Sequence, residues 1–450
     1  MKSVVLKFGG STLRTGDDLE KIENILRLRQ TPFVLVVSAV SGVTNMLTEA
    51  LENLPNLNVD GFLDNLERIY QAFLQEPSSE LRQRVFAIKD FLRGAQLIGE
   101  APPFVYDYVL SHGERCSSLL LTTYLNNHGM TCNEMLPEQF GLITDGIYGN
   151  ASVDLGQTEA HVKEYFIKED QSYVVPGFYG VCDGKVTVLG RGGSDYTATS
   201  LAYCLNAERV ELYKDVPGFM SCDPKFVKDA KPIRELSYAE AAELSYFGAK
   251  ILHHSAIEPA SKRHIPVHIY NMNAFNPQGT SDTIICADSC ITHSVVKSIS
   301  FTDDVVVIQF AGENVGRVPG ILGTIASTFG NANINIKSVI TSQTSINVLI
   351  SKQDVDKCKK VTERMDIPHV DNILYRTDIS LIAAVGDGLL KRHSVAARIF
   401  SSVSKQGINV EMISAGASNV TIYFLVRTAD RQKALKAIHD EFFSGGEQNP

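Results

Sequence analysis

Hydrophobic and polar residues alternate along about the first 290 residues in a pattern typical of an α/β domain. Short apolar runs predict buried strands at Ser3–Lys7, Phe33–Ser38, Tyr173–Val175, Val186–Leu189, Val210–Tyr213 and Val267–Tyr270. Between them, helical patterns run through residues 60–92, 104–125, 196–205 and 238–247, of which the first is long and charged. Strands that alternate with helices in this way predict a largely parallel sheet.

Beyond Ile285 the pattern changes to two similar segments. Residues 334–336 (Ile-Asn-Ile) of the first correspond to residues 408–410 (Ile-Asn-Val) of the second. Each segment predicts a helix, a strand, a small polar turn, a second strand and a closing charged helix. These are expected at 325–329, 334–336, 341–343, 346–350 and 354–365 in the first copy, and at 399–403, 408–410, 415–417, 420–425 and 429–442 in the second. The order predicts a βαββαβ unit that occurs twice.

Composition narrows the class of protein. Lys and Arg number 42 against 51 Asp and Glu, a net charge of −9, which argues against a nucleic-acid surface. No apolar run approaches the 18 or so residues of a membrane helix, and the apolar run at the N-terminus is too short for a signal peptide. The 8 cysteines form no Cys-x-x-Cys pair. We therefore expect a cytoplasmic protein with reduced thiols, no zinc site, and no nucleic-acid or membrane partner.

Two glycine-rich segments follow predicted strands. At residues 7–11 a strand ends in Lys-Phe-Gly-Gly-Ser, and glycine backbone can approach an anion closely beside the charge of Lys7. This is not a Walker A loop, because the lysine precedes the glycines, and alone it would equally suit a tight turn. Residues 190–195 are Gly-Arg-Gly-Gly-Ser-Asp, and a helix is expected to begin near Ser194 or Asp195. Simple N-capping would explain Asp195, whereas glycines together with Arg191 indicate an anion site at a helix N-terminus.

Four further segments carry polar residues that could serve a site. Residues 38–45 form a hydroxyl-rich turn after a buried strand, and Glu114 of the Ser-His-Gly-Glu segment could grip an α-ammonium group. Residues 214–225 form a Pro- and Gly-containing loop after a strand, where parallel sheets bind nucleotides. A Gly–Lys pair follows at residues 248–250. His112 and the pair His253–His254 are expected to be structural, because nothing nearby in the sequence completes a metal site.

Together and in this order, the segments KFGG, SHGE, GRGGSDYTA, DVPG with its later DP, and FGAK resemble those of the aspartokinases, members of the amino-acid kinase superfamily. The resemblance covers essentially the whole chain. It implies an α/β amino-acid kinase fold over residues 1–290, with a mostly parallel sheet sandwiched by helices. Two α+β ACT domains of ferredoxin-like βαββαβ type are implied over 300–370 and 375–445, the second with the option of sharing strands from 292–301.

The resemblance also implies an activity and a set of residues. Such an enzyme transfers the γ-phosphate of ATP to the side-chain carboxylate of L-aspartate, the first step towards lysine, threonine and methionine. The implied residues are Lys7 and Asp195 for catalysis; Ser38, Thr44, Glu114 and Arg191 for aspartate; and Gly9, Gly10, Gly192, Gly193, Ser194, Asp215, Asp223, Lys225 and Lys250 for the nucleotide. An effector amino acid is expected near Val318, Gly320, Ile321, Leu322, Ile336, Lys337 and Gln343. Mg²⁺ is expected to bind mainly through the phosphates, without protein ligands of its own.

Four residues depart from what is usual in that family. Lys214 stands where Thr or Ser often precedes the aspartate, and Met220 where many members have Tyr. Lys225 replaces a frequent Arg, and His254 stands where Pro is usual. These departures bear on nucleotide affinity more than on the chemistry, because the residues expected to act in catalysis are all present.

Two other functions remain open at this level. Glu114 and Arg191 would suit another α-amino acid such as glutamate, and a catalytically silent amino-acid sensor could carry the same ACT domains. A carboxylate acceptor has a pKa near 4, so it is ionised at pH 7 and needs no general base. The effector is left as lysine or threonine, since Lys337 stands where lysine-sensing relatives often have an acidic residue. Because ACT sheets have open edges, we expect a homo-oligomer, a dimer or larger.

Overall fold

A computed structural model of the chain describes residues 4–29, 31–74, 76–165, 171–275, 280–287, 295–365, 367–389 and 392–444. The chain divides into two compact units. The first consists of Met1–Met220, Pro232–Tyr246 and Lys250–Cys290, and the second of Ser221–Lys231, Phe247–Ala249 and Ile291–Pro450. Two short segments of the N-terminal part therefore belong to the second unit.

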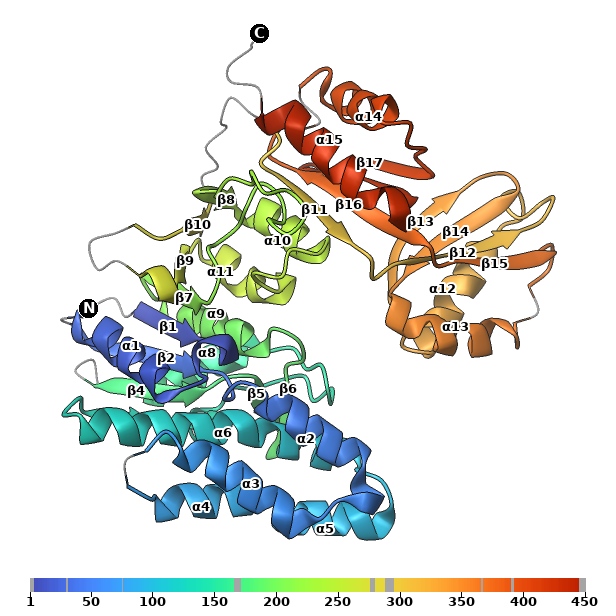
Figure 1. Cartoon of the computed structure of the whole chain (residues 1–450). Helices are drawn as coiled ribbons and strands as arrows, with labels where there is room; N and C mark the ends of the chain where they lie inside the picture. The colour runs from blue at the N-terminus through green and yellow to red at the C-terminus, as the bar shows by residue number, and fades with distance from the viewer. Residues whose placement is uncertain are drawn as a thin grey trace. The chain divides into compact units, whose positions relative to one another are not determined.

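The first unit is built on an eight-stranded sheet in the order β3-β4-β2-β1-β7-β9-β10-β8 (Figure 1). Every pairing in it is parallel except that of β9 with β10. The strands are β1 Val4–Phe8, β2 Phe33–Val37, β3 Cys132–Glu134, β4 Ser172–Pro176, β7 Arg209–Lys214, β8 Glu235–Ser237, β9 Val267–Asn271 and β10 Thr283–Cys286, and a separate hairpin joins β5 Tyr179–Cys182 to β6 Lys185–Val188. The central strands β1 and β2 are buried along their whole length, as apolar runs in a parallel sheet require.

Helices cover both faces of this sheet. They are α1 Gly16–Arg27, α2 Val43–Glu52, α3 Val59–Gln71, α4 Ser79–Phe86, α5 Lys89–Ile98, α6 Pro103–Asn127, α7 Pro137–Phe140, α8 Leu155–Tyr165, α9 Gly193–Leu205, α10 Tyr238–Tyr246 and α11 Glu258–Lys262, with 3-10 turns η1 Gly10–Thr12, η2 Leu54–Asn56, η3 His254–Ala256 and η4 Met272–Ala274. Helix α6 packs on β2, β3 and β4, while α9 packs on β1, β2 and β7 and is itself covered by α8 and α11. The predicted mostly parallel sheet between helices is confirmed.

Alternation along β1 assigns its residues to the two faces. Val4, Leu6 and Phe8 belong to the hydrophobic cluster that includes residues of α1 and α6. Val5 and Lys7 must point to the other face, because successive side chains of a strand alternate. That other face is the one that α9 covers, so Lys7 points towards α9.

The second unit holds two four-stranded sheets with helices (Figure 1). The first sheet, β13-β14-β12-β15, is formed by a contiguous βαββαβ segment: β12 Val306–Ala311, α12 Ile321–Asn331, β13 Ile336–Thr341, β14 Ser345–Ile350, α13 Val355–Thr362 and β15 Asn372–Arg376, with η5 Lys352–Asp354. The second sheet, β11-β16-β18-β17, uses β16 Ile379–Val385, α14 Val395–Lys405, β17 Met412–Ser418, β18 Thr421–Arg427 and α15 Arg431–Phe443, with η6 Thr428–Asp430. Its remaining strand is β11 Ser298–Thr302, which precedes the first repeat and pairs with β16.

The segment Ser221–Lys231 is part of the core of this unit. Cys222 and Val227 belong to the same hydrophobic cluster as α14 and α15. Ser221 Oγ lies 2.9 Å from His439 Nε2, and the Ile299 N–H donates to the Ser221 carbonyl over 2.8 Å. A loop expected at the nucleotide is thus anchored by strands and helices of the repeats.

Local expectations differ from the structure in several places. The strand predicted at residues 408–410 is wrong, because these residues lie before β17, which begins at Met412, and the strand predicted at 334–336 begins only at Ile336. The long helical stretch 60–92 is divided among α3, α4 and α5, and Val186–Leu189 contributes to the hairpin rather than to the main sheet. The turn predicted at residues 415–417 is wrong, because these residues lie inside β17. The pairing of β17 with β18 is irregular between Ala415 and Ser418, where Gly416 has φ of 91°, so the small residues mark a bulge instead of a turn.

Two expectations from composition can be compared with the described part of the chain. Seven of the cysteines are free thiols there, while Cys290 lies outside the described residues. Among the described residues, no helix combines the length and apolar character that a membrane crossing needs.

Candidate active site

Three neighbouring parallel strands end at one edge of the large sheet. Lys7 of β1 lies opposite Val36 of β2 and Leu212 of β7. Ser38 follows the last residue of β2, and Lys214 is the last residue of β7. Because parallel strands end on the same side, these three polar residues gather at the carboxyl edge, where ligands bind in open α/β sheets.

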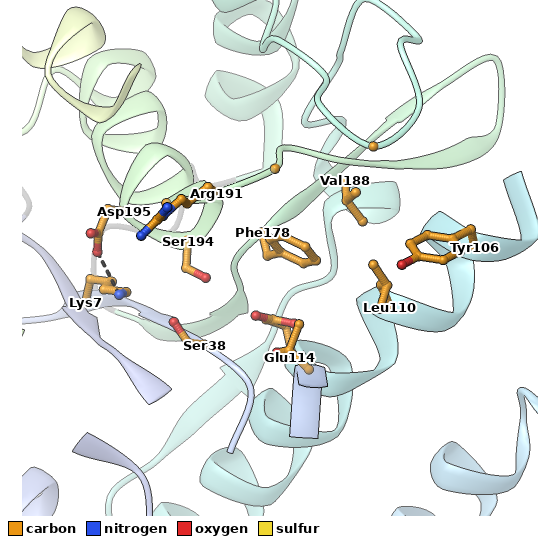
Figure 2. Close-up of a pocket in the computed structure, with 15 residues that line it drawn as sticks. Lys7, Ser38, Tyr106, Leu110, Glu114, Phe178, Val188, Arg191, Ser194 and Asp195 are labelled. Carbon is orange, nitrogen blue, oxygen red and sulfur yellow. Dashed lines mark ion pairs between the residues drawn. The ribbon is translucent and has the colours of Figure 1, made fainter. Parts of the chain in front are cut away.

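Asp195 joins this edge from the first turn of α9. The helix begins at Gly193 after Gly192, which has φ of 76° and ψ of 9°, so neither Ser194 nor Asp195 is the N-cap and the simple capping explanation is wrong. Asp195 is 5% exposed. Its Oδ1 lies 2.7 Å from Lys7 Nζ, and its Oδ2 accepts a hydrogen bond of 2.6 Å from Lys214 Nζ (Figure 2 shows the Lys7 pair). One carboxylate therefore holds two ammonium groups.

Electrostatics in this cluster follow from burial and mutual attraction. Burial alone would raise the pKa of Asp195, but the ammonium groups of Lys214 and Lys7 outweigh it and lower the pKa to about 2. Burial lowers the pKa of Lys7; Asp195 opposes this effect, and the like charge of Lys214 adds to it. Asp195 is thus expected to be ionised at pH 7.

Glu114 is a buried carboxyl group without a partner for one of its oxygens. It lies in the middle of α6, is 3% exposed, and its Oε2 has no hydrogen-bond partner among the described residues. Burial raises its pKa to about 8, although the Ala39 N–H, its own N–H and the charge of Lys7 act in the opposite direction. A buried carboxyl left in this state is suited to a cationic ligand group that would both pair with it and ionise it.

The glycine beside Glu114 has a packing reason. A Cβ at Gly113 would lie 2.7 Å from the Ala39 Cβ, so only glycine allows α6 to approach the turn after β2 this closely. The contact is reinforced by Ser117, whose Oγ accepts a hydrogen bond of 3.0 Å from the Val40 N–H and donates to the Gly113 carbonyl. The same close approach brings the Ala39 N–H to the Glu114 carboxyl group.

These side chains line one pocket with a volume of about 340 Å³. It contains nine of the residues expected at the site: Lys7, Ser38, Thr44, Glu114, Arg191, Gly192, Gly193, Ser194 and Asp195. Figure 2 shows Glu114 on one side of the pocket, and Lys7, Asp195, Ser194 and Arg191 on the other. The acceptor-binding and catalytic residues expected from sequence are therefore brought together, while their individual roles stay predictions.

The remaining nucleotide candidates do not line this pocket. A Cβ at Gly10 would meet the Ala39 carbonyl at 2.9 Å, so glycine is needed there for close packing, and a Cβ at Gly9 would lie 3.2 Å from Lys7 Nζ and press on that ammonium group. Asp215 is exposed and accepts a hydrogen bond of 2.9 Å from Ser11 Oγ, and Lys250 is exposed as well. Asp223 and Lys225 lie on the segment Ser221–Lys231 of the second unit, where the Lys225 N–H donates to Asp223 Oδ1.

Several residues of the site were missed by sequence reasoning. Leu110 lies one turn and Tyr106 two turns before Glu114 on the same face of α6, and Phe178 and Val188 add further apolar surface (Figure 2). Tyr106, Leu110 and Glu114 follow one another at intervals of four residues, which places them on one face of a helix. This interval alone could not identify the pocket, because a buried helix has apolar residues on every face. Lys214 was noticed only as a departure from the family, and the structure places it on Asp195.

His112 and His253, which are expected to be structural, are both held by hydrogen bonds within the protein. Burial lowers the pKa of His112 to about 3, and that of His253 to about 4 with help from His254 and Arg191. His112 Nδ1 lies 2.9 Å from the Tyr108 carbonyl and His253 Nδ1 lies 2.8 Å from Ser255 Oγ. Within the described ranges, no three His, Cys, Asp or Glu side chains gather in a way that could hold a metal ion.

The expected effector residues lie in the first repeat of the second unit. Gly320 has φ of 94° and precedes α12, Ile321 is buried at the start of that helix, and Leu322 is exposed. Val318 and Ile336 are partly buried against the core of the repeat, and Gln343 is exposed just after β13. Lys337 Nζ lies 3.1 Å from Asp304 Oδ2, so its charge already has an anionic partner.

Comparison with known proteins agrees with this architecture. Residues 2–271 match the model of the amino acid kinase family, and residues 308–364 and 382–442 match an ACT domain model. The chain is 31% identical to aspartokinase 1, chloroplastic, of Arabidopsis thaliana, over 98% of this chain and 80% of that protein. Aspartokinase III of E. coli in complex with aspartate and ADP has a TM-score of 0.85 at 26% identity, covering 98% of this chain and all of that one. The same enzyme with lysine and aspartate has a TM-score of 0.79 at 27% identity over 98% of this chain and all of that one.

The similarity thus runs along nearly the whole chain, through the parallel-sheet domain and both βαββαβ repeats. The chain belongs to the amino acid kinase family and, within it, to the aspartokinases.

Proposed function

We propose that this protein is an ATP-dependent aspartate kinase, which phosphorylates the side-chain carboxylate of L-aspartate to give 4-phospho-L-aspartate. The observation that carries the proposal is a pocket with two polar sides. On one side lies the buried carboxyl of Glu114, whose Oε2 has no hydrogen-bond partner among the described residues, and on the other lies the Lys7–Asp195 cluster. The first group suits an α-ammonium, and the second suits a phosphoryl group in transfer. The E. coli relative of similar structure was solved with aspartate and ADP.

In the proposed reaction the residues of the pocket orient two anions and neutralise their repulsion. Glu114 holds the α-ammonium of aspartate and Arg191 its α-carboxylate, while Ser38 and Thr44 line the space for the side chain. The ionised side-chain carboxylate attacks the γ-phosphorus without a general base. Lys7, held by Asp195, neutralises charge that develops on the transferring group. Removal of one such donor typically slows an enzyme by about 100- to 1,000-fold.

Magnesium is proposed to enter with the nucleotide, as MgATP. Each Asp195 oxygen already faces a lysine, and the described residues offer no other acidic group in the pocket besides Glu114. Mg²⁺ commonly keeps several waters and binds through phosphate oxygens with few protein ligands. The donor groups present therefore fit a metal that belongs to the substrate complex.

The activity is tested by trapping the acyl phosphate. Purified full-length protein with MgATP and aspartate is expected to form a hydroxamate when hydroxylamine is added, and far less with glutamate. The Lys7→Ala variant, which is expected to turn over slowly, serves as the negative control. Equal yields from glutamate would overturn the choice of acceptor, and no yield from either amino acid would favour a silent sensor.

We further propose that an amino acid, lysine or threonine, regulates the enzyme through the ACT repeats, near Val318–Leu322 and Asn335–Gln343. The strands β13, β15, β11 and β17 end their sheets, and such edges favour side-by-side pairing with another copy. A homodimer or larger assembly is the expected state. Steady-state inhibition by lysine, threonine and methionine, together with sedimentation analysis, tests both parts; a monomer insensitive to all three would contradict them. The cytoplasmic location stays a prediction, testable by cell fractionation.

A further inference from the structure

Lys214 is placed by strand register on the same face as Lys7. In the pairing of β1 with β7, Lys7 lies opposite Leu212, and Phe8 lies opposite Tyr213. Phe8 and Tyr213 stack with ring centroids 4.5 Å apart and belong to the cluster on the α1 and α6 face. Lys214 is two residues beyond Leu212, so it returns to the face of Lys7 and of α9. Both lysines therefore point to the first turn of α9, one from each strand.

Two lysine side chains share the single carboxylate of Asp195, so with both lysines protonated the cluster has one positive charge more than the carboxylate neutralises. Side-chain exposure is 6% for Lys7, 14% for Lys214 and 7% for Asp195. Glu114 would supply a second negative charge, but burial raises its pKa to about 8, so before aspartate binds it is mostly protonated at pH 7. A largely buried excess of positive charge is costly unless an anion enters beside it. The pair of lysines therefore marks a place for a ligand that carries more negative charge than aspartate alone.

Lys214 lies towards the phosphate donor rather than towards aspartate. Lys7 pairs with Oδ1 of Asp195 and lines the pocket, whereas Lys214 binds Oδ2 and does not line it. Its neighbour Asp215 accepts a hydrogen bond from Ser11 Oγ, and β7 packs against the turn η1, which begins at Gly10 directly after Gly9. The end of β7 is thus beside the glycine turn, where the polyphosphate is expected.

We propose that Lys214 binds the γ-phosphate of MgATP together with Lys7, and that Asp195 holds both ammonium groups in position. This inference rests on the proposed kinase function. In the reaction, the bond from the γ-phosphorus to the β-γ bridging oxygen breaks as the bond to the aspartate carboxylate oxygen forms. The leaving negative charge remains on ADP, and no proton is transferred. Two ammonium groups on the γ-phosphate would compensate for the repulsion between acceptor and donor.

A purely structural role predicts something different. If Lys214 only neutralises Asp195, its removal leaves a balanced one-to-one pair of Lys7 with Asp195. Stability would then change, but binding of a triphosphate would not change relative to a diphosphate. The ratio of the two affinities is therefore the informative quantity.

The experiment measures nucleotide binding to the full-length protein by calorimetry, without aspartate. The probes are the Mg²⁺ complexes of a non-hydrolysable β,γ-imido ATP analogue and of ADP. Lys214→Met is expected to weaken binding of the triphosphate by about 10- to 100-fold, the range for a lost charged hydrogen bond, and that of ADP by less than about threefold. Lys214→Arg should restore part of the loss because it keeps the charge. Lys262→Met is the matched control, since Lys262 is an exposed helix lysine paired with Glu258.

Each outcome decides the proposal. An unchanged triphosphate affinity, or an equal or larger loss for ADP, would overturn it, as would a wild-type protein that binds neither probe. If Lys214→Met does not fold, Lys214→Thr replaces it, because relatives often have Thr at this position. The same selective loss of triphosphate affinity relative to ADP affinity is then expected for Lys214→Thr. Because aspartate is absent, a failure to make hydroxamate would count against the proposed function alone. As a second readout, the KM for ATP should rise in Lys214→Met while the KM for aspartate stays within about twofold.

Discussion

Glu114→Gln removes one titratable group from the pocket while the shape of the side chain is kept. In the empty protein, burial raises the pKa of Glu114 to about 8. Pairing with the α-ammonium of aspartate requires the ionised carboxylate, so binding must release the proton that Glu114 carries. Aspartate affinity should therefore depend on pH in the wild type and not in the variant.

The magnitude follows from the pKa. With a pKa of about 8, roughly 1% of Glu114 is ionised at pH 6, about 10% at pH 7 and about half at pH 8. The apparent affinity for aspartate is proportional to the fraction of Glu114 that is ionised, so the Kd for aspartate should fall about fiftyfold between pH 6 and pH 8. At pH 7 binding should release about 0.9 proton per site. Loss of a buried charge pair typically costs about 3–5 kcal/mol, so Glu114→Gln should weaken binding by more than about 100-fold.

Calorimetry in two buffers of different ionisation enthalpy measures both quantities at once. Glu240→Gln is the control, because Glu240 is also fully buried but accepts a hydrogen bond from the Ser237 N–H at the start of α10, outside the pocket. That variant should lose stability and keep the affinity, the pH profile and the proton release. A wild-type affinity that does not vary between pH 6 and 8, or a Glu114→Gln variant that binds aspartate normally, would refute the assignment of Glu114.

The same shift makes a prediction for stability. A carboxyl whose pKa is raised on folding stabilises the folded state below its unfolded pKa near 4.5, and this contribution is lost as pH rises towards about 8. The slope is about 1.4 kcal/mol per pH unit within that window. Thermal melts of the empty protein at pH 6 and pH 8 should therefore differ more in the wild type than in Glu114→Gln. Added aspartate should raise the wild-type Tm most at the higher pH.

Further predictions concern single side chains. Lys7→Ala should lower kcat by about 100-fold or more while thermal melting shows a folded protein, and near-normal turnover would show that Lys7 is only a structural partner of Asp195. Gly192→Ala should lower both stability and activity, because φ is 76° and a Cβ would overlap His253, whereas Gly94→Ala in α5, with open space around it, should stabilise by about 0.5–1 kcal/mol. Gly248→Ala should destabilise the second unit, because φ is 110° and a Cβ would overlap the carbonyl of Phe301; a melt unchanged from wild type would contradict this.

Much of this protein follows from the order of residues alone. The strands β1, β2 and β7 are apolar runs long enough for a buried parallel sheet, and the repeat of residues 334–336 at 408–410 predicts two βαββαβ units. Ser38 directly after β2 and Arg191 to Asp195 shortly after β6 lie where local sequence decides which side chain reaches the pocket, whereas Glu114 lies in the middle of α6. The resemblance to the aspartokinases then named Lys7, Ser38 and Asp195 before their distances were known.

Only the tertiary structure determined which charged groups form ion pairs and which segments of the chain belong to the same compact unit. Lys214 and Asp195 are 19 positions apart in the chain, and their 2.6 Å contact depends on the register of β7 with β1 and on where α9 begins. The raised pKa of Glu114 depends on how completely α6 is buried, which a helical pattern does not reveal. Likewise, the packing of Cys222 and Val227 against the C-terminal helices assigns residues 221–231 to the second unit. Hydrophobic periodicity and turn chemistry are local, so the sequence alone determines them. Burial and long-range pairing are properties of the folded chain, so only the tertiary structure determines them.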